Sequence, residues 1–294
     1  MRKSITYSTV VLHIILYILT VVTLASGMVK FCLSDSGKYY EGIINDEFDN
    51  TILSATKGAF QTNQSVVALP SQELYESLNR NALLEDAHKY TRSVIHSLFT
   101  GEEVVQYRSE HKELAETVNR QFDAFEQESG MKTSEEDRTA ILNLFIDNVN
   151  AQANYLPEAL TGAVSRIGTV VSRVVSDVSD VFWPMLLLTV CVSVIIFVLN
   201  KDNLSRAAYK SATALWLASA TIFIPTMIFC SYDVTKRLKL VSSGMASFVQ
   251  GFIGTVESSM RLWSVLFFCV FTVGLAGCIV WYSLVKAKRH RHHI

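Results

Sequence analysis

The sequence predicts an all-α membrane protein with four transmembrane helices. It also predicts a large helical extracytoplasmic insert between helices 1 and 2, and helical stalks that continue into helices 2 and 4. Three observations lead to this class: four long uncharged stretches, one acidic segment, and basic residues gathered in the short segments. Since a helix rises about 1.5 Å per residue and the hydrocarbon core is about 30 Å thick, each stretch can cross a bilayer once. The uncharged stretches are residues 4–29, 181–200, 211–232 and 262–285.

Residues 1–32 are expected to form a cytoplasmic tip and the first transmembrane helix. Arg2 and Lys3 ahead of an apolar run, followed by small residues at 23–26, are also typical of a cleaved secretory signal. The run is longer than the roughly 15 residues of a signal core, which favours an uncleaved anchor. His13 is the ionisable side chain inside the four stretches. We expect a neutral imidazole bonded to a neighbouring helix, with a proton relay as the alternative.

Residues 33–180 are predicted to form an acidic helical domain outside the cytoplasm. Residues 35–180 contain 24 acidic and 12 basic side chains, whereas the whole chain has a net charge of −1. This acidity excludes nucleic acid as an expected partner. Apolar residues at helical spacing predict helices near 40–60, 83–99, 104–128 and 133–155, with Thr133 and Glu136 as a capping box. Gly130 is expected to end the third helix, and Gly58 with residues 61–65 to begin a loop.

The strongest periodicity precedes the second span. Apolar residues alternate at spacings of four and three, which is the pattern of a coiled-coil seam. Because no Pro or Gly lies between Gly168 and Pro184, one helix is expected from near Pro157 into the membrane, with Gly168 as its weak point. Packing within one protomer and self-association are both compatible with the pattern. The seam is Leu160, Val164, Ile167, Val171, Val174, Val178 and Val181.

Residues 181–294 are expected to hold helices 2–4, an extracytoplasmic amphipathic link (231–261) and a basic cytoplasmic tail. The link contains a second apolar stripe, which begins at Leu240 and Val241 and predicts another stalk. The N-terminus, the link between helices 2 and 3, and the C-terminal tail together carry nine basic residues and one acidic residue. Basic short segments stay in the cytoplasm, so both termini are expected there. Ala214 with Ala218, and Gly274 with Cys278, have the spacing of helix-contact pairs.

Cysteine is sparse, which excludes a disulfide-stapled domain. Cys32 and Cys230 both fall at the outer ends of spans, where they can form a disulfide or remain two thiols. A cysteine-poor exterior suits the plasma membrane of a bacterium.

Signatures of catalysis and of cofactor binding are weak. Ser54 and Lys57 match the S-x-x-K spacing of serine acyl-enzymes, but the companion motifs are missing. Glu85 and His88 have the spacing of one metal-binding pair, without the second pair that a di-metal bundle needs. We therefore expect no enzyme activity, no metal and no cofactor.

Three functional hypotheses follow from this layout. The first is an integral membrane protein whose helical domain binds an extracytoplasmic protein, as a receptor, adaptor or assembly factor. The alternative is an oligomeric channel or pore assembled through the stalk helices, which makes a homo-oligomer the partner besides the lipid bilayer. A membrane enzyme is the third hypothesis, and no polar cluster in the sequence favours it.

Overall fold

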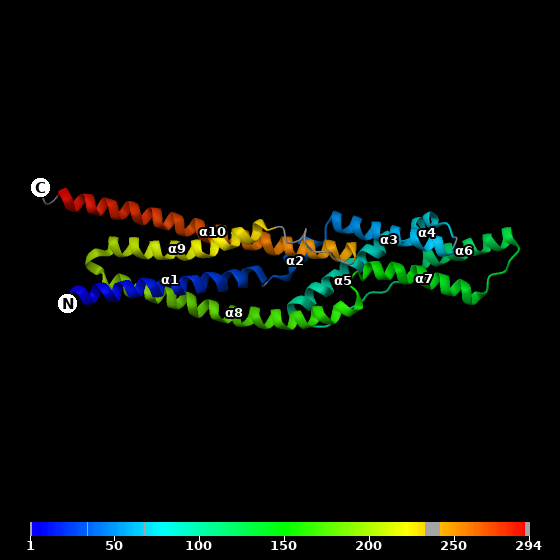
Figure 1. Cartoon of the computed structure of the whole chain (residues 1–294), viewed down its shortest axis with the longest axis horizontal. Helices are drawn as coiled ribbons and strands as arrows, with labels where there is room; N and C mark the ends of the chain where they lie inside the picture. Colours follow the sequence, from blue (N-terminus) through cyan, green and yellow to red (C-terminus); the bar gives the residue numbers. More distant parts are fainter. Residues whose placement is uncertain (1, 34, 68, 233–241, 292–294) are drawn as a thin grey trace. The chain divides into compact units, whose positions relative to one another are not determined.

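The structure is a computed structural model that describes residues 2–33, 35–67, 69–232 and 242–291. In this part of the chain every regular element is a helix, and no strand occurs. Four helices are long and apolar enough to cross a membrane (Figure 1). The prediction of an all-α protein with four helices that can cross a membrane is therefore confirmed. The segments that contain the spans are Ser8–Leu33, Glu135–Leu199, Lys201–Ser231 and Ser243–Lys288.

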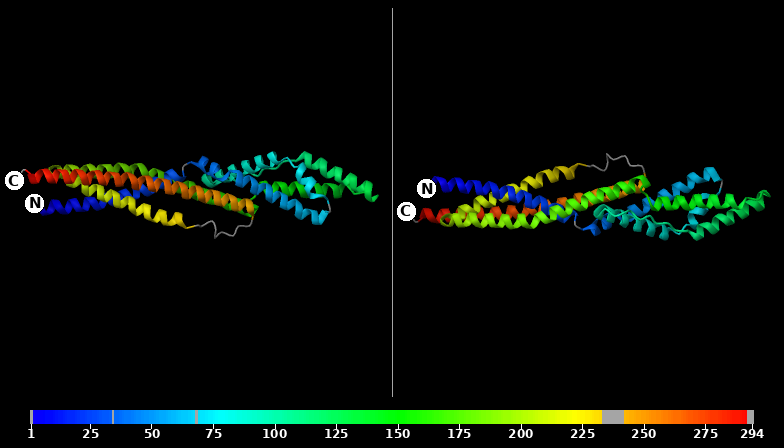
Figure 2. Two further views of the ribbon diagram at one scale, coloured as in Figure 1. Left: turned by 90° about the horizontal axis from the view of Figure 1, so that it is seen from above. Right: turned by 90° about the horizontal axis from the view of Figure 1, so that it is seen from below.

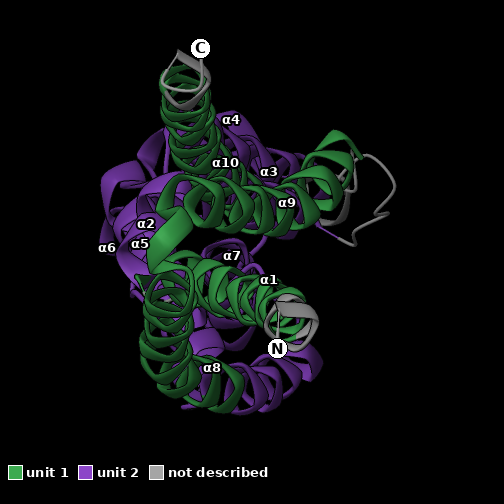
Figure 3. Cartoon of the chain, turned by 90° about the vertical axis from the view of Figure 1, so that its left-hand side faces the viewer, with its two compact units in different colours: residues 1–35, 173–234, 256–294 green, residues 36–172, 235–255 purple. Residues whose placement is uncertain are grey.

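The chain divides into two compact units, shown in different colours in Figure 3. Unit 1 consists of residues 1–35, 173–234 and 256–294, and it contains the apolar spans. Unit 2 consists of residues 36–172 and 235–255, so it holds most of the predicted insert and part of the predicted link.

Unit 1 is built from α1 (Arg2–Leu33), the later part of α8 (Glu158–Leu199), α9 (Leu204–Ser231) and most of α10 (Ser243–Arg291). The short 3₁₀ helix η1 (Lys201–Asn203) joins α8 to α9. The helices α1 and α9 run in one direction, and α8 and α10 run in the other (Figures 1 and 2). The start of α1, η1 and the end of α10 therefore lie at the same end of unit 1.

Small residues bring α9 close to α1 and α8. Leu16, Val192 and Ile196 form a buried cluster with Ala207 and Ala214. Ala214 and Ala218 are 8% and 0% exposed, so the predicted contact pair of α9 is indeed buried. Gly274 has no neighbour within 4 Å of the position that a Cβ would take, so the contact predicted for it is wrong.

The large apolar side chains of unit 1 point outward to an unusual degree. In a soluble protein the contiguous apolar patches on the surface are small. A surface as apolar as that of unit 1 is suited to contact with lipid. Representative exposed side chains are Val10, Ile14, Ile18, Leu187, Val190, Val198, Leu262, Val270, Val273 and Leu284.

Hydroxyl groups also link the spans. The hydroxyl of Tyr17 donates to Thr221 Oγ1 at 2.9 Å, because the Thr221 hydrogen is already given to a backbone carbonyl. The indole N–H of Trp216 donates to Thr272 Oγ1 at 3.0 Å, which joins α9 to α10. Such bonds are worth about 0.6 kcal/mol each within a membrane, so they orient the helices more than they stabilise them.

Unit 2 is a helical domain, and most of it comes from one continuous stretch of the chain, residues 36–172. Its complete helices are α2 (Ser36–Ile43), α3 (Asp46–Val67), α4 (Ser71–Ser77), α5 (Arg80–Thr100), α6 (Lys112–Ser129) and α7 (Glu135–Ala153). The first part of α8 and the first turns of α10 complete the unit. Helix α3 packs on α4, α5 and α7, while α5 also packs on α2.

An aromatic cluster around Tyr155 forms the centre of unit 2. The ring centroid of Tyr155 lies 5.8 Å from that of Phe48, 5.3 Å from that of Tyr90 and 5.8 Å from that of Phe248. The Tyr155 hydroxyl bonds Thr91 Oγ1 at 3.1 Å, and Thr91 in turn donates to a carbonyl of its own helix. Tyr155 is therefore the donor, and its polar atom is satisfied inside the core.

Three sequence predictions for unit 2 require correction. Ser134, not Thr133, caps α7, since the Ser134 hydroxyl accepts from the backbone N–H of Asp137 at 3.0 Å. Helix α3 continues through Gly58, where no loop begins. Helix α6 begins at Lys112, eight residues after the predicted start at 104, and it ends before Gly130 as predicted, with φ +68° at that glycine.

Candidate functional site

Residues 101–111, which we call the strap, connect α5 to α6 without any helix, turn or bend. The sequence prediction of a helix from Val104 is wrong here because polar side chains of α5, α7 and α8 bind the strap backbone. The strap is the longest non-helical segment in the described part of the chain. Loops that a rigid scaffold holds are where binding residues concentrate, so the strap is the candidate site.

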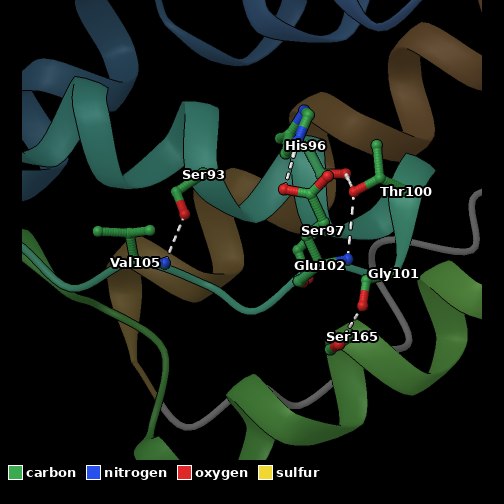
Figure 4. Close-up of polar contacts among 8 residues, drawn as sticks. All are labelled: Ser93, His96, Ser97, Thr100, Gly101, Glu102, Val105 and Ser165. Carbon is green, nitrogen blue, oxygen red and sulfur yellow. Dashed lines mark hydrogen bonds and ion pairs between the residues drawn. The ribbon is translucent and has the colours of Figure 1, made fainter.

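The first residues of the strap are fixed by serines (Figure 4). The Ser165 hydroxyl of α8 donates to the carbonyl of Gly101 at 2.5 Å, and the Ser97 hydroxyl donates to the carbonyl of Glu102 at 2.5 Å. The N–H of Val105 donates to Ser93 Oγ at 2.6 Å. Three hydroxyls therefore replace the partners that these backbone groups would have in a helix.

Two glycines allow α8 to approach this point closely. A Cβ on Gly168 would lie 1.8 Å from the Ser97 carbonyl oxygen, and one on Gly101 would lie 2.8 Å from the Thr169 nitrogen. Gly101 also has φ +81° and caps α5. The face of α8 that packs in unit 2 is thus its small-residue face, and Gly168 is a contact position, not the weak point that the sequence suggested.

Asn150 of α7 and Asn154, which caps the C-terminus of α7, hold the middle of the strap. The Asn154 side chain accepts from the N–H of Tyr107 at 3.0 Å and donates to its carbonyl at 2.7 Å. Asn150 does the same for Ser109, at 3.1 and 3.4 Å. Residues four apart on a helix rise about 6 Å, and residues two apart on an extended chain rise about 6.6 Å. The two amides therefore act like a neighbouring β-strand, and they require an extended backbone at 107–109.

The opposite edge of the strap is unpaired. In an extended chain the N–H and C=O groups of successive residues point to opposite sides. The backbone groups of residues 105, 107 and 109 face the helices. The backbone N–H and C=O groups of residues 104, 106 and 108 therefore lie on the other edge. In the described residues, the backbones of Val104, Gln106 and Arg108 make no hydrogen bond. Gln106 and Arg108 are exposed.

Charged side chains lie beside the strap. One hollow beside Val105 and Tyr107 is lined by Lys89, Arg92 and His96, which are spaced at three and four residues along α5. Lys89 is paired with Glu85 at 2.7 Å, but the Arg92 guanidinium lies over the ring of Tyr40, 4.2 Å from its centroid, without an ion pair among the described residues. A basic face thus borders the strap in an otherwise acidic domain. Because His96 pairs with Glu102 at 3.2 Å, Arg92 is the member of this face whose charge has no ion pair among the described residues.

A second hollow lies between the strap and α7. Arg108 forms an ion pair with Asp147, and both side chains are exposed. Asn150, Asn154 and Pro157 complete this wall of the hollow. Sequence reasoning missed the strap, although the Asn150-x-x-x-Asn154 spacing was the signal, because two amides four residues apart on one helix face can bind alternate residues of an extended chain.

The residues of the predicted seam on α8 are not fully buried in the structure. Ile167, Val174 and Val181 are 53%, 47% and 42% exposed. The other four members, Leu160, Val164, Val171 and Val178, are half-buried. Since α8 packs on α5 through Ser165, Gly168 and Thr169, the seam lies on a different face. Self-association through the seam stays a prediction. Leu240 and Val241, which begin the second predicted stripe, lie outside the described residues.

The two predicted outer cysteines both lie in unit 1. Cys32 and Cys230 are buried thiols in the structure. Cys230 Sγ lies 3.5 Å from the carbonyl oxygen of Glu257 on α10, to which it donates. A disulfide between Cys32 and Cys230 stays a prediction.

The weak catalytic and metal motifs are not brought together. His88 bonds Asp49 at 2.7 Å, while its sequence partner Glu85 pairs with Lys89. No group of three metal-ligating side chains occurs among the described residues. Lys57 lies over the ring of Tyr75, 6.0 Å from its centroid, and Ser54 lines a shallow hollow with Asn50.

His13 lies on α1, on the side that faces α9. Its Nδ1 donates to the carbonyl of Thr9 at 2.6 Å, since a carbonyl only accepts. Its Nε2 lies 3.5 Å from the Ser211 hydroxyl of α9, a long contact to the neighbouring helix. The imidazole is thereby oriented toward α9.

No protein-family model, no curated protein and no solved structure matches this chain. The geometry of the strap is therefore the basis on which a function can be assigned.

Proposed function

We propose that the protein is a multi-pass protein of the cell membrane that displays unit 2 on the outside to bind an extended, acidic segment of a partner protein. The unpaired edge at Val104, Gln106 and Arg108 is the observation that carries the proposal. An exposed strand edge is a template for main-chain pairing with a second extended chain. No catalytic step is part of the proposal.

The fixed position of the strap supports binding by strand addition. The asparagine pair and the serines order the backbone before a partner arrives, so the partner alone loses conformational freedom on binding. The bound segment would direct alternate side chains toward the hollow that contains Arg92 and Lys89. Carboxylates at those positions complement the basic face, which is the reason for proposing an acidic segment.

The orientation of the spans is also part of the proposal. The start of α1, η1 and the end of α10 lie at one end of unit 1. The segments at that end are the ones in which nine of ten charged residues are basic. The positive-inside rule supports placing that end, with both termini, in the cytoplasm.

Photocrosslinking in native membranes tests the proposal. A photoreactive residue placed at exposed Glu110 of the full chain is expected to form an adduct with a partner protein, whereas the same residue at exposed Met131 is not. The substitution Gln106→Pro removes an outward N–H that has no partner within the chain, and the extended backbone accommodates proline. We expect this variant to fold and to lose the adduct.

The matched control is Gln106→Ala, which keeps the N–H and is expected to keep the adduct. An adduct that persists at full yield in Gln106→Pro would show that pairing with the strap edge is not the mode of binding. If no adduct forms at Glu110 in any membrane tested, the proposed display function is wrong.

The seam on α8 supports the alternative, an oligomeric channel or pore. Exposed apolar residues at heptad spacing are typical of a helix that pairs with another helix. Measurement of the oligomeric state in lipid nanodiscs decides this point. A monomer without conductance in planar bilayers excludes the alternative and leaves the display function untouched.

A further inference from the structure

We propose that the groove between α1 and α9 in unit 1 binds an anionic phospholipid. The inference is independent of the strap, and it requires only that the apolar helices lie in a bilayer. Two features carry it: an apolar channel on the outer surface of the helix pair, and unpaired hydrogen donors at one end of that channel.

The channel has the volume and the apolar lining for an acyl chain. Its volume is about 460 Å³, and Val10, Ile14 and Leu217 line it. These three side chains are 47%, 54% and 47% exposed, so the channel opens on the surface that lipid would cover. An acyl chain is the expected occupant along these apolar side chains, because the polar side chains beside them, His13, Tyr17 and Thr213, already have hydrogen-bond partners in the protein.

The donors lie at the end of the channel nearest η1. Lys210 lines the groove and is half-buried, and it has no ion pair in the described part of the chain. The ring of Tyr209 stacks on Tyr282, with centroids 5.6 Å apart, while its hydroxyl has no hydrogen-bond partner among the same residues. Tyr209 and Lys210 thus bring a hydroxyl and an ammonium group to the lining of the same groove, where a phosphate could accept from them.

Electrostatics selects an anionic headgroup. A cation at the edge of the hydrocarbon is unfavourable unless an anion or water solvates it. The nearby basic residue Arg206 raises the positive potential at this end of unit 1. A zwitterionic lipid would bring a choline group into that potential, whereas phosphatidylglycerol brings a net negative charge.

Native mass spectrometry of the full-length protein, released from detergent with added lipid, tests the inference. The probes are dioleoyl phosphatidylglycerol and dioleoyl phosphatidylcholine, which share their acyl chains. We expect the protein to retain phosphatidylglycerol in preference. The substitution Lys210→Gln should weaken that retention about fivefold, since one cation contributes about 1 kcal/mol to anionic lipid binding.

Lys201→Gln is the matched control, because Lys201 is exposed, carries the same charge and does not line the groove. We expect it to leave retention nearly unchanged. Glycerol phosphate, which has the headgroup without acyl chains, should not displace the lipid. Equal retention of the two lipids, or an equal effect of Lys201→Gln and Lys210→Gln, would overturn the inference. Displacement of the lipid by glycerol phosphate would contradict a lipid site and would show that the groove binds a phosphate group alone.

Discussion

His111 is the residue at which the strap becomes α6. It is the one non-glycine residue with positive φ (+47°) among the described residues, and it is 6% exposed. A left-handed backbone at a non-glycine residue is held only where its surroundings fix it. Ser109, two residues earlier, donates to the carboxylate of Asp86, which is also buried. His111 and Asp86 together fix the direction in which the strap leaves the helices.

Acidification is expected to destabilise unit 2 through His111. Burial lowers the pKa of the His111 imidazole below its usual value of about 6.5, and the carboxylates of Asp86 and Glu113 oppose this only in part. The unfolded chain therefore takes up the proton at higher pH than the folded chain does. Stability should be full above about pH 6.5 and should fall as the pH drops toward the folded pKa.

The thermal midpoint of the full-length protein, measured at about pH 7.5 and about pH 5.5, checks this prediction. His111→Gln should reduce the loss on acidification. His96→Gln, at an exposed histidine that pairs with Glu102, should keep the wild-type slope. If His111→Gln keeps the full loss on acidification, other groups are responsible.

At the scale of single elements, α8 shows that a glycine in a helix can have opposite effects at two positions. Gly168 touches the last turn of α5, whereas Gly162 has no neighbour within 4 Å of the position a Cβ would take. Helix propensity alone assigns both glycines a cost of about 1 kcal/mol relative to alanine. The contact at Gly168 reverses that preference, because the atom in the way belongs to a backbone that cannot rotate aside.

Alanine substitution at the two glycines should therefore change stability in opposite directions. Gly162→Ala is expected to stabilise the protein by up to about 1 kcal/mol through helix propensity. Gly168→Ala is expected to destabilise it by about 1–3 kcal/mol, since α8 must move away from the Ser97 carbonyl. The free energy of unfolding in urea, measured on the full chain in detergent, checks both. A stabilising Gly168→Ala would contradict the close packing of α8 on α5.

The strap shows the limit of helical periodicity as evidence. Val105, Leu114, Val118 and Phe122 recur at intervals that suit one helix, and only the last three are buried on α6. The interval cannot reveal that Ser93 and Asn154, distant in sequence, supply partners for an extended backbone. Such long-range hydrogen bonds override local propensity.

At the scale of the whole molecule, composition was the most reliable source of prediction. The four apolar helices follow from uncharged runs alone, because lipid imposes a minimum length and excludes charge. Gly130 was correctly predicted to end α6, since only a residue free to adopt positive φ fits that position. The face of α8 that packs could not be predicted, because Ser165 and Gly168 contribute fit and hydrogen bonds, not hydrophobicity.

The orientation of the chain in the membrane is the prediction on which the display function depends. The short segments at the η1 end of unit 1 are basic, whereas residues 35–180 carry about twice as many acidic as basic side chains. A charge difference of this kind should leave both termini in the cytoplasm and unit 2 outside.

Epitope tags at both ends should stay unlabelled in intact cells and become labelled after permeabilisation. A Met131→Cys side chain, on the exposed loop between α6 and α7, should react with an impermeant maleimide in intact cells. The same reagent on the parent chain measures the background of the native cysteines. Labelling of either tag without permeabilisation would place the strap inside the cell, where an extracytoplasmic partner cannot reach it.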